Sequence, residues 1–143
     1  MCALMLMQPK RRKYRKQHIP VLKGVAKRGY EVAFGTYGLK AMENGYLSSR
    51  QLESVRKVVV RRTRKVGKIW MRVFPDVPFT KKGLEMPMGK GKGDVDQYKA
   101  PVKKGKIILE VTGISEAEAK DVFRQAARKL PIKAKMVEKG EIH

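Results

Sequence analysis

The sequence predicts a single α+β domain with a strongly basic surface, and three observations lead to this fold class. The chain has 143 residues, a length at which one modest hydrophobic core is expected. Hydrophobic residues make up 42% of it, too many for a disordered basic tail. Strand-like and helix-like segments follow one another without a regular βαβ order, which is typical of a compact α+β fold. We expect residues 1–28 to form a basic N-terminal extension and residues 29–143 to form the domain.

The first predicted elements follow the extension. Residues 9–28 contain no acidic residue and show no sustained period, which is typical of an extended basic segment. Residues 31–35 are predicted to form a short strand, and Gly35 and Gly38 to bracket a turn.

A first helix is predicted to begin at Ser48, where Gln51 completes a Ser-x-x-Gln capping box. Glu53 is the only acid within this helix, whereas a solvated helix face normally carries both signs of charge. The cationic face is therefore predicted to meet a polyanion. Four apolar residues should face the core and five cations should lie opposite them: Leu52, Val55, Val59 and Val66 against Arg50, Lys57, Arg61, Arg64 and Lys65.

The next predicted strand covers residues 68–74 and alternates between two faces. Residues 75–105 are rich in Gly, Lys and Pro, and they are predicted to form a long loop that is either functional or disordered. A further strand is expected at residues 106–111. In the strand at residues 68–74, one face consists of Ile69, Met71 and Val73, and the other consists of Trp70, Arg72 and Phe74.

The second predicted helix begins at Ser115, where Glu118 completes another capping box, and it stops at Pro131. A final strand is expected at residues 132–137. The apolar residues of the helix recur at helical spacing and are predicted to be core: Ala119, Val122, Phe123, Ala126, Ala127 and Leu130.

The charge of the chain points to a polyanionic partner. The formal net charge is +21, and such self-repulsion destabilises a compact fold unless a polyanion neutralises it. The excess of basic over acidic residues lies in the N-terminal part of the chain. Residues 1–40 hold ten basic side chains and one acid, while residues 107–143 hold seven basic side chains and six acids.

The sequence contains no run of about 18 consecutive apolar residues, so it predicts no membrane span. The first residues are apolar and then basic, the opposite of a secretory signal, although an organellar transit peptide stays open.

Catalytic and metal chemistry are not supported by the sequence. A single cysteine, Cys2, with His18 and His143 provides neither a disulfide framework nor a Cys/His zinc module. Neither histidine has a credible catalytic partner nearby in sequence, and Asp94 and Asp96 lie among lysines, where charge compensation is their simplest role. We therefore expect no enzyme, no cofactor, no metal and no small-molecule substrate.

The glycine-rich run at residues 88–93 invites comparison with phosphate-binding loops. Gly83 and Gly89 are one residue too far apart for the Walker pattern, and Asp94 occupies the last glycine position of G-x-G-x-x-G. The run still offers two cations and a backbone that can approach phosphates closely. A mobile surface loop is an equally good reading of its composition.

Five segments, in order, resemble one family: PKRRKYRK (9–16), VAFGTYGLKA (32–41), GKIWMRVFPD (67–76), MGKGKG (88–93) and AARKLPIK (126–133). This family is bacterial-type ribosomal protein sixteen of the large subunit, also described as the universal L-sixteen/L-ten-e family. The resemblance covers nearly the whole chain. It departs at residues 17–28, and at Pro87, where many members have an arginine that can be hydroxylated.

The resemblance implies a hammerhead-type α+β sandwich in the large subunit of a bacterial-type ribosome, in the cytoplasm, with an organellar ribosome not excluded. The partners it implies are 23S-type rRNA, A-site tRNA and neighbouring large-subunit proteins, with contact to P-site tRNA left open and no membrane partner. The rRNA-binding residues expected are Lys10, Arg11, Arg12, Lys13, Arg15, Lys16, Arg50, Lys57, Arg61, Arg64, Lys65 and Arg72. The tRNA-proximal loop is expected to include Lys81, Lys82, Met88, Gly89, Lys90, Gly91, Lys92 and Gly93. The aromatic residues Trp70 and Phe74 are assigned to packing.

Two other functions stay open on the residues alone. A free-standing nucleic-acid-binding module, such as a basic architectural DNA binder, would share the charge and would bind duplex DNA with similar affinity. An RNA-modifying enzyme would need a cofactor pocket and a catalytic constellation, neither of which the sequence indicates.

Overall fold

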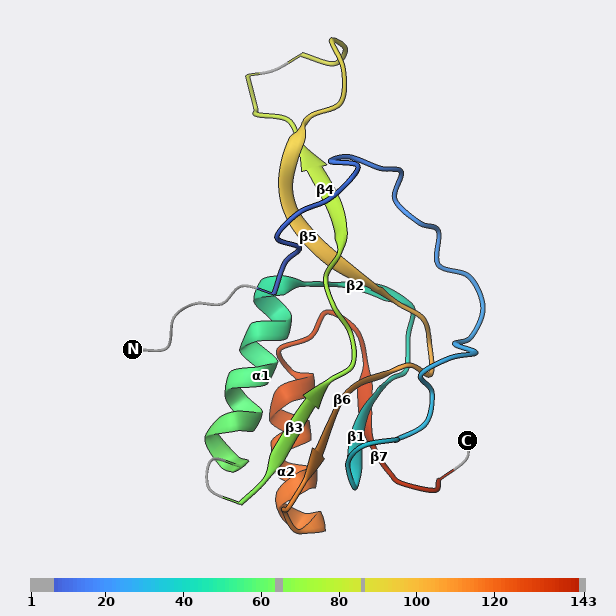
Figure 1. Ribbon diagram of the computed structural model, residues 1–143, viewed down its shortest axis with the longest axis vertical. Coiled ribbons are helices and arrows are strands. Elements are labelled where there is room, and N and C mark those ends of the chain that lie inside the picture. Colours follow the sequence, from blue (N-terminus) through green and yellow to red (C-terminus); the bar gives the residue numbers. More distant parts are fainter. Residues whose placement is uncertain (1–6, 64–65, 86, 142–143) are drawn as a thin grey trace.

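The computed structural model describes residues 7–63, 66–85 and 87–141, in which two helices pack beside two antiparallel sheets (Figure 1). This mixed architecture confirms the predicted α+β class. No helix among these residues is long and apolar enough to cross a membrane. The elements are β1 (Tyr37–Ala41), β2 (Gly45–Ser48), α1 (Ser49–Thr63), β3 (Lys68–Met71), β4 (Val77–Lys81), β5 (Asp94–Val102), β6 (Ile107–Thr112), α2 (Glu116–Ala127) and β7 (Ala134–Glu138).

The two sheets divide the molecule into a body and a projection. The body contains a four-stranded sheet in the order β3-β6-β1-β7, and the second sheet has the order β2-β5-β4. Strands β4 and β5 form a long hairpin that extends away from the body (Figure 1). The hairpin loop, residues 82–93, lies at its far end.

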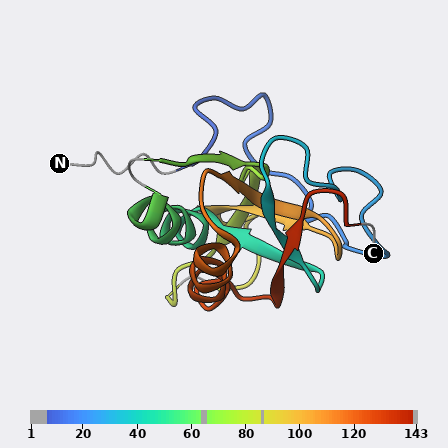
Figure 2. The same ribbon diagram turned by 90° about the horizontal axis from the view of Figure 1, so that it is seen from below.

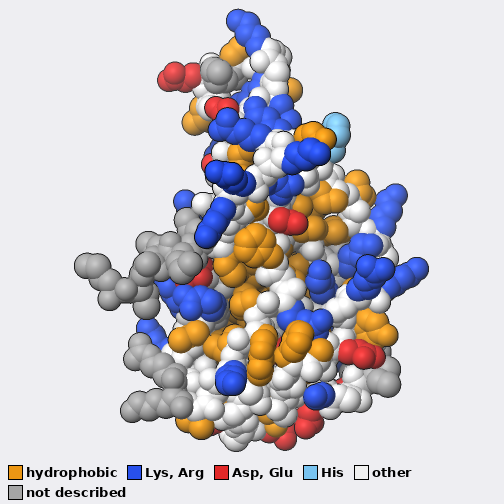
Figure 3. Space-filling model, in the orientation of Figure 1, with side chains coloured by type: hydrophobic (Ala, Val, Ile, Leu, Met, Phe, Trp, Pro, Cys, Tyr) orange, Lys and Arg blue, Asp and Glu red, His pale blue; other side chains and the backbone are white. Residues whose placement is uncertain are grey.

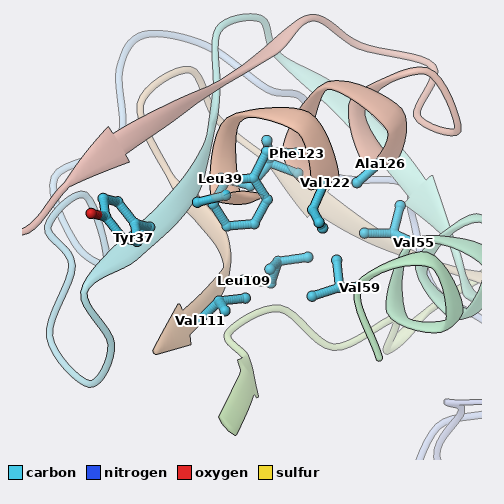
Figure 4. Packing of buried hydrophobic residues seen from close by; sticks show 10 residues of the cluster. Tyr37, Leu39, Val55, Val59, Leu109, Val111, Val122, Phe123 and Ala126 are labelled. Carbon is cyan, nitrogen blue, oxygen red and sulfur yellow. The ribbon is translucent and has the colours of Figure 1, made fainter. Parts of the chain in front are cut away.

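The main core lies between the helices and one face of the four-stranded sheet. Leu39 of β1 and Leu109 of β6 point towards Val59 of α1 and Phe123 of α2 (Figure 4). All four side chains are buried, with exposed fractions of at most 2%. Burial of large apolar side chains contributes about 1.5–3 kcal/mol each, so this contact holds both helices to the sheet.

Both helices begin as their capping boxes predict. The Ser48 hydroxyl accepts a hydrogen bond from the Gln51 amide (3.2 Å), and the Gln51 side chain accepts one from the Ser48 amide (2.9 Å). Ser115 and Glu118 make the same reciprocal pair at the start of α2. These bonds satisfy amides that have no partner inside the helix.

The opposite face of the four-stranded sheet is covered by residues 25–36, which we call the strap (Figure 2). The Ala26 amide donates to the Lys104 carbonyl and the Thr36 amide to the Val111 carbonyl. Between these anchors the strap is fixed by Gly35, where a Cβ atom would lie 2.7 Å from the carbonyl oxygen of Val111. Only glycine allows this approach, because real Cβ contacts under 3.0 Å essentially do not occur.

Several predicted boundaries are wrong. Residues 31–35 form no strand, because the amides of Ala33 and Phe34 donate to the carboxylate of Glu110. The strands instead occupy residues 37–41 and 45–48. Helix α1 ends at Thr63, so Val66 lies outside it and is 80% exposed.

The interval 75–105 is also not the structureless loop that its composition predicted, since it contains β4 and β5. The prolines fit these strands because of where they lie. Pro78 is in β4, an edge strand, whereas Pro101 lies in the central strand β5, beyond the stretch that pairs with β4 and opposite Tyr46 of β2. A proline that lacks an amide hydrogen is tolerated where no neighbouring strand requires it.

Candidate nucleic-acid interface

Two predicted binding segments that are far apart in sequence lie against each other. The Lys16 ammonium donates to the Lys92 carbonyl (3.0 Å), and the Lys92 ammonium donates to the Gln17 carbonyl (2.6 Å). These reciprocal bonds join basic segment 10–16 to the hairpin loop, as the path of the chain beside β4 and β5 in Figure 1 also shows. The structure therefore gathers most of the predicted cations into one region.

The hairpin loop is held in an unusual backbone conformation. Three consecutive residues have positive φ: Gly89 (108°), Lys90 (59°) and Gly91 (94°). The two glycines adopt this conformation without a steric penalty. The Lys82 ammonium donates to the Gly89 carbonyl (2.5 Å), which closes the loop and leaves Lys90 exposed.

Lysine and arginine side chains gather over the hairpin and over the segment that lies against it, as Figure 3 shows for this face of the molecule. In this loop Met88 is 97% exposed, so it projects into solvent and does not pack on the hairpin. The cations of this region are exposed or half-buried: Lys10, Arg11, Arg12, Lys13, Arg15 and Lys16 in the segment, and Lys81, Lys82, Lys90 and Lys92 in the hairpin.

Helix α1, which contacts β5 with its packed side, carries a second group of predicted cations. Arg50, Lys57 and Arg61 recur at intervals of seven and four residues, so they lie on one face of the helix. All three are exposed and make no ion pair with any described residue. Two further predicted cations, Arg64 and Lys65, lie outside the described residues.

The other arginines of α1 are used within the protein. Arg62 pairs with Asp121 of α2 at 3.4 Å, and Arg56 makes a bidentate contact with Glu53. The hydrogen bond from the Arg56 guanidinium holds the pKa of the Glu53 carboxyl below its usual value, against the opposing effect of burial. The helical pattern of the sequence had indicated Arg50, Lys57 and Arg61 and neither of these two arginines.

Arg72 has internal partners. Its guanidinium lies 3.6 Å from the buried carboxylate of Glu110 and donates to the Glu31 carbonyl (2.7 Å). It also lies over the ring of Phe34, which stacks on Trp70 with ring centroids 6.2 Å apart. The structure thus gives Arg72 a role in holding the strap, while its contact with RNA stays a prediction.

A further group of cations was not predicted from the sequence. Residues 20–28 and the connection between β5 and β6 line a hollow of about 800 Å³. The hollow forms only because the extension packs against the body of the molecule, which the sequence does not indicate. The run Lys103-Lys104-Gly105-Lys106 was the available signal. The cations around the hollow are Lys23, Lys27, Arg28, Lys103 and Lys106.

The residues considered for catalysis are not brought together. Among the described residues, no group of three or more His, Cys, Asp or Glu side chains is placed to hold a metal ion. His18 is exposed, while Cys2 and His143 lie outside the described residues.

Comparison with known proteins identifies the family. The family model described as ribosomal protein L16p/L10e matches residues 9–137. The chain belongs to this family. It is 49% identical to the large ribosomal subunit protein uL16 of Halorhodospira halophila, over 92% of this chain and 96% of that protein. It is 48% identical to the uL16 protein of Thermosipho africanus, over 96% of both chains, and 47% identical to that of Aeromonas hydrophila, over 92% and 96%.

The family assignment confirms several predictions. It confirms the resemblance found in the sequence and a structural ribosomal role, and it excludes the RNA-modifying enzyme, because the relatives are ribosomal structural proteins. The bacterial relatives also confirm the expected localisation in the cytoplasm, with a bacterial-type ribosome.

Proposed function

We propose that this protein is a structural component of the large ribosomal subunit that binds large-subunit rRNA with its basic surface and contacts A-site tRNA with the hairpin loop. The observation that carries the proposal is the contact between basic segment 10–16 and the hairpin loop. These two segments form one cationic region, and the exposed stripe on α1 supplies further cations. A folded RNA presents phosphates over a surface as wide as this cationic region, whereas an acidic peptide does not.

Electrostatic attraction supplies the affinity in this proposal. Neutralising about 10 phosphates gives a slope of log K against log salt near −9 for a duplex, and somewhat less for single strands. Phosphate contacts carry no sequence information, so specificity comes from the shape of the folded RNA. The projecting hairpin fits a recess that a flat basic surface could not enter.

The rRNA part of the proposal is tested by incorporation into ribosomes. Replacing Lys10, Arg11, Arg12 and Lys13 by Gln should reduce recovery of tagged protein in large subunits after sucrose-gradient sedimentation and a high-salt wash. The matched control replaces Lys120, Lys129, Lys133 and Lys139 by Gln, which removes the same charge from the C-terminal part. Equal recovery of both variants, at one copy per rRNA, would overturn the role of the basic segment.

The tRNA part needs a separate measurement on assembled ribosomes. Lys90→Gln removes an exposed charge of the hairpin loop, and Lys129→Gln is the control. We expect weaker A-site tRNA binding and unchanged incorporation for Lys90→Gln only. A-site affinity equal to the control would refute tRNA contact by this side chain, and P-site affinity, measured in parallel, decides whether that tRNA is also contacted.

A further inference from the structure

Lys40 of β1 is buried without a charged partner. Its exposed fraction is 8%, and it makes no ion pair and no side-chain hydrogen bond with any residue that the structure describes. Among the described residues, no buried side-chain nitrogen or oxygen lacks a hydrogen-bond partner, so the unpaired Lys40 ammonium reaches solvent although the rest of the residue is buried. The stem of Lys40 is therefore buried, while its charged end is available to an anion from outside the chain.

The fold aims Lys40 away from the core. Its neighbour Leu39 faces the helices, so Lys40 lies on the opposite face of the sheet, beneath the strap. Beside it on β7 lies Lys135, its direct cross-strand partner. Two like charges in this arrangement repel each other.

The strap and the sheet line a cavity of about 210 Å³ at this point, and it is open to solvent on one side. Lys40, Lys135 and Lys104 all line it, together with Tyr30, and no carboxylate of the described chain does. Gly105, with φ of 97°, closes one wall and lies against Lys40, since a Cβ there would be 3.8 Å from the Lys40 Cε atom. The cavity is therefore bordered by three lysines and by no acidic residue of the described chain.

We propose that this cavity binds a phosphate group. Three ammonium groups and the Tyr30 hydroxyl are all hydrogen-bond donors, and they match the oxygens and the charge of a phosphoryl anion. At about 30 Å³ per water molecule, the cavity has room for such a group with several waters. The phosphate comes either from the RNA backbone or from free phosphate. The first source rests on the proposed function, and the second does not.

The site is tested first with inorganic phosphate alone, on the full-length protein. Thermal unfolding is measured with phosphate against chloride at equal ionic strength. At ten times the dissociation constant, phosphate should raise the Tm of the wild type by about 5 °C. Lys40→Met should abolish this rise, because it removes one of the ammonium groups at the cavity. Lys129→Met, which removes an exposed charge elsewhere, should retain the rise and leave the Tm in chloride unchanged.

Lys135→Met provides a second variant at an exposed position, for which folding is not at risk. It should also reduce the phosphate-dependent rise. If Lys40→Met and Lys135→Met both respond to phosphate like the wild type, the cavity is not a phosphate site. This outcome leaves the proposed ribosomal function untouched, because that function is measured by incorporation.

The source of the phosphate is decided with a large-subunit rRNA fragment in phosphate-free buffer. An RNA-backbone site predicts that Lys40→Met weakens binding about tenfold relative to Lys129→Met. Equal RNA affinity, together with loss of the inorganic-phosphate response, supports the site and assigns it to free phosphate. Equal RNA affinity with an unchanged phosphate response overturns the proposal.

Discussion

The carboxylate of Glu110 is expected to be the most sensitive single group of the fold. It is fully buried in β6, accepts hydrogen bonds from the strap amides of Ala33 and Phe34, and faces Arg72 at 3.6 Å. The informative perturbation is Glu110→Gln, which preserves the size of the side chain. It removes the charge and replaces one acceptor by an NH₂ donor that faces a backbone amide.

The size of the effect follows from these contacts. Two unit charges 3.6 Å apart interact by about 4.6 kcal/mol at an effective dielectric constant near 20. An unpaired buried amide adds a penalty of about 1–3 kcal/mol, while the retained amide oxygen keeps part of the hydrogen bonding. We therefore expect Glu110→Gln to lower the free energy of unfolding by about 3–5 kcal/mol, the range for a broken buried pair.

The assay is equilibrium unfolding in urea, combined with a double-mutant cycle on Glu110 and Arg72. Arg72→Gln supplies the second single variant, and the coupling energy should be about 2 kcal/mol. Glu43→Gln is the control, because Glu43 pairs with Lys133 at 3.8 Å on the surface and should change stability by less than about 0.5 kcal/mol. A loss for Glu110→Gln as small as that of the control would refute the reasoning.

Three further predictions concern other parts of the fold. Ser115→Ala removes the capping box of α2 and should cost about 1 kcal/mol in the same urea assay, and an unchanged midpoint would show that the cap is dispensable. The folded-state pKa of Glu53 is lowered by Arg56, so this pair stabilises the protein above the ordinary value of 4.5 and the stabilisation is lost as pH falls through the lowered pKa. Arg56→Gln should therefore show a smaller loss of stability than the wild type between about pH 5 and pH 3, as followed by unfolding at each pH, and parallel curves would contradict the assignment. Gly35→Ala places a Cβ 2.7 Å from the Val111 carbonyl oxygen, so it should detach the strap and speed hydrogen exchange of the strap amides, whereas unchanged exchange would mean that the contact is not needed.

The helices were predictable because their signals are local. Ser48 with Gln51 and Ser115 with Glu118 each satisfy amides within one turn, so four residues suffice to place a helix start. The strand at residues 31–35 failed for the opposite reason. Its amides bond a carboxylate 76 and 77 residues away, and nothing nearby in the sequence indicates this partner.

The hairpin shows a second limit of sequence patterns. Gly, Lys and Pro in residues 75–105 argue against strands when each residue is judged alone. Pairing between β4 and β5 overrides these preferences of the single residues. It is compatible with the prolines where the ladder requires no amide hydrogen from them. Within the candidate interface, Arg50, Lys57 and Arg61 were correctly expected to be exposed, whereas the internal pairing of Arg72 was not expected.

The sequence by itself determined the family, the α+β class, both helix starts and the excess of positive charge, because ordered motifs, capping boxes and composition are properties of the chain as written. The tertiary structure alone decided which cations stay available for a partner. Arg72 is taken up by Glu110, while Lys40 is buried beside Lys135 with no carboxylate in reach. The physical reason is that a charge is neutralised by whatever lies within a few ångströms, and folding sets that distance for residues that the sequence places far apart.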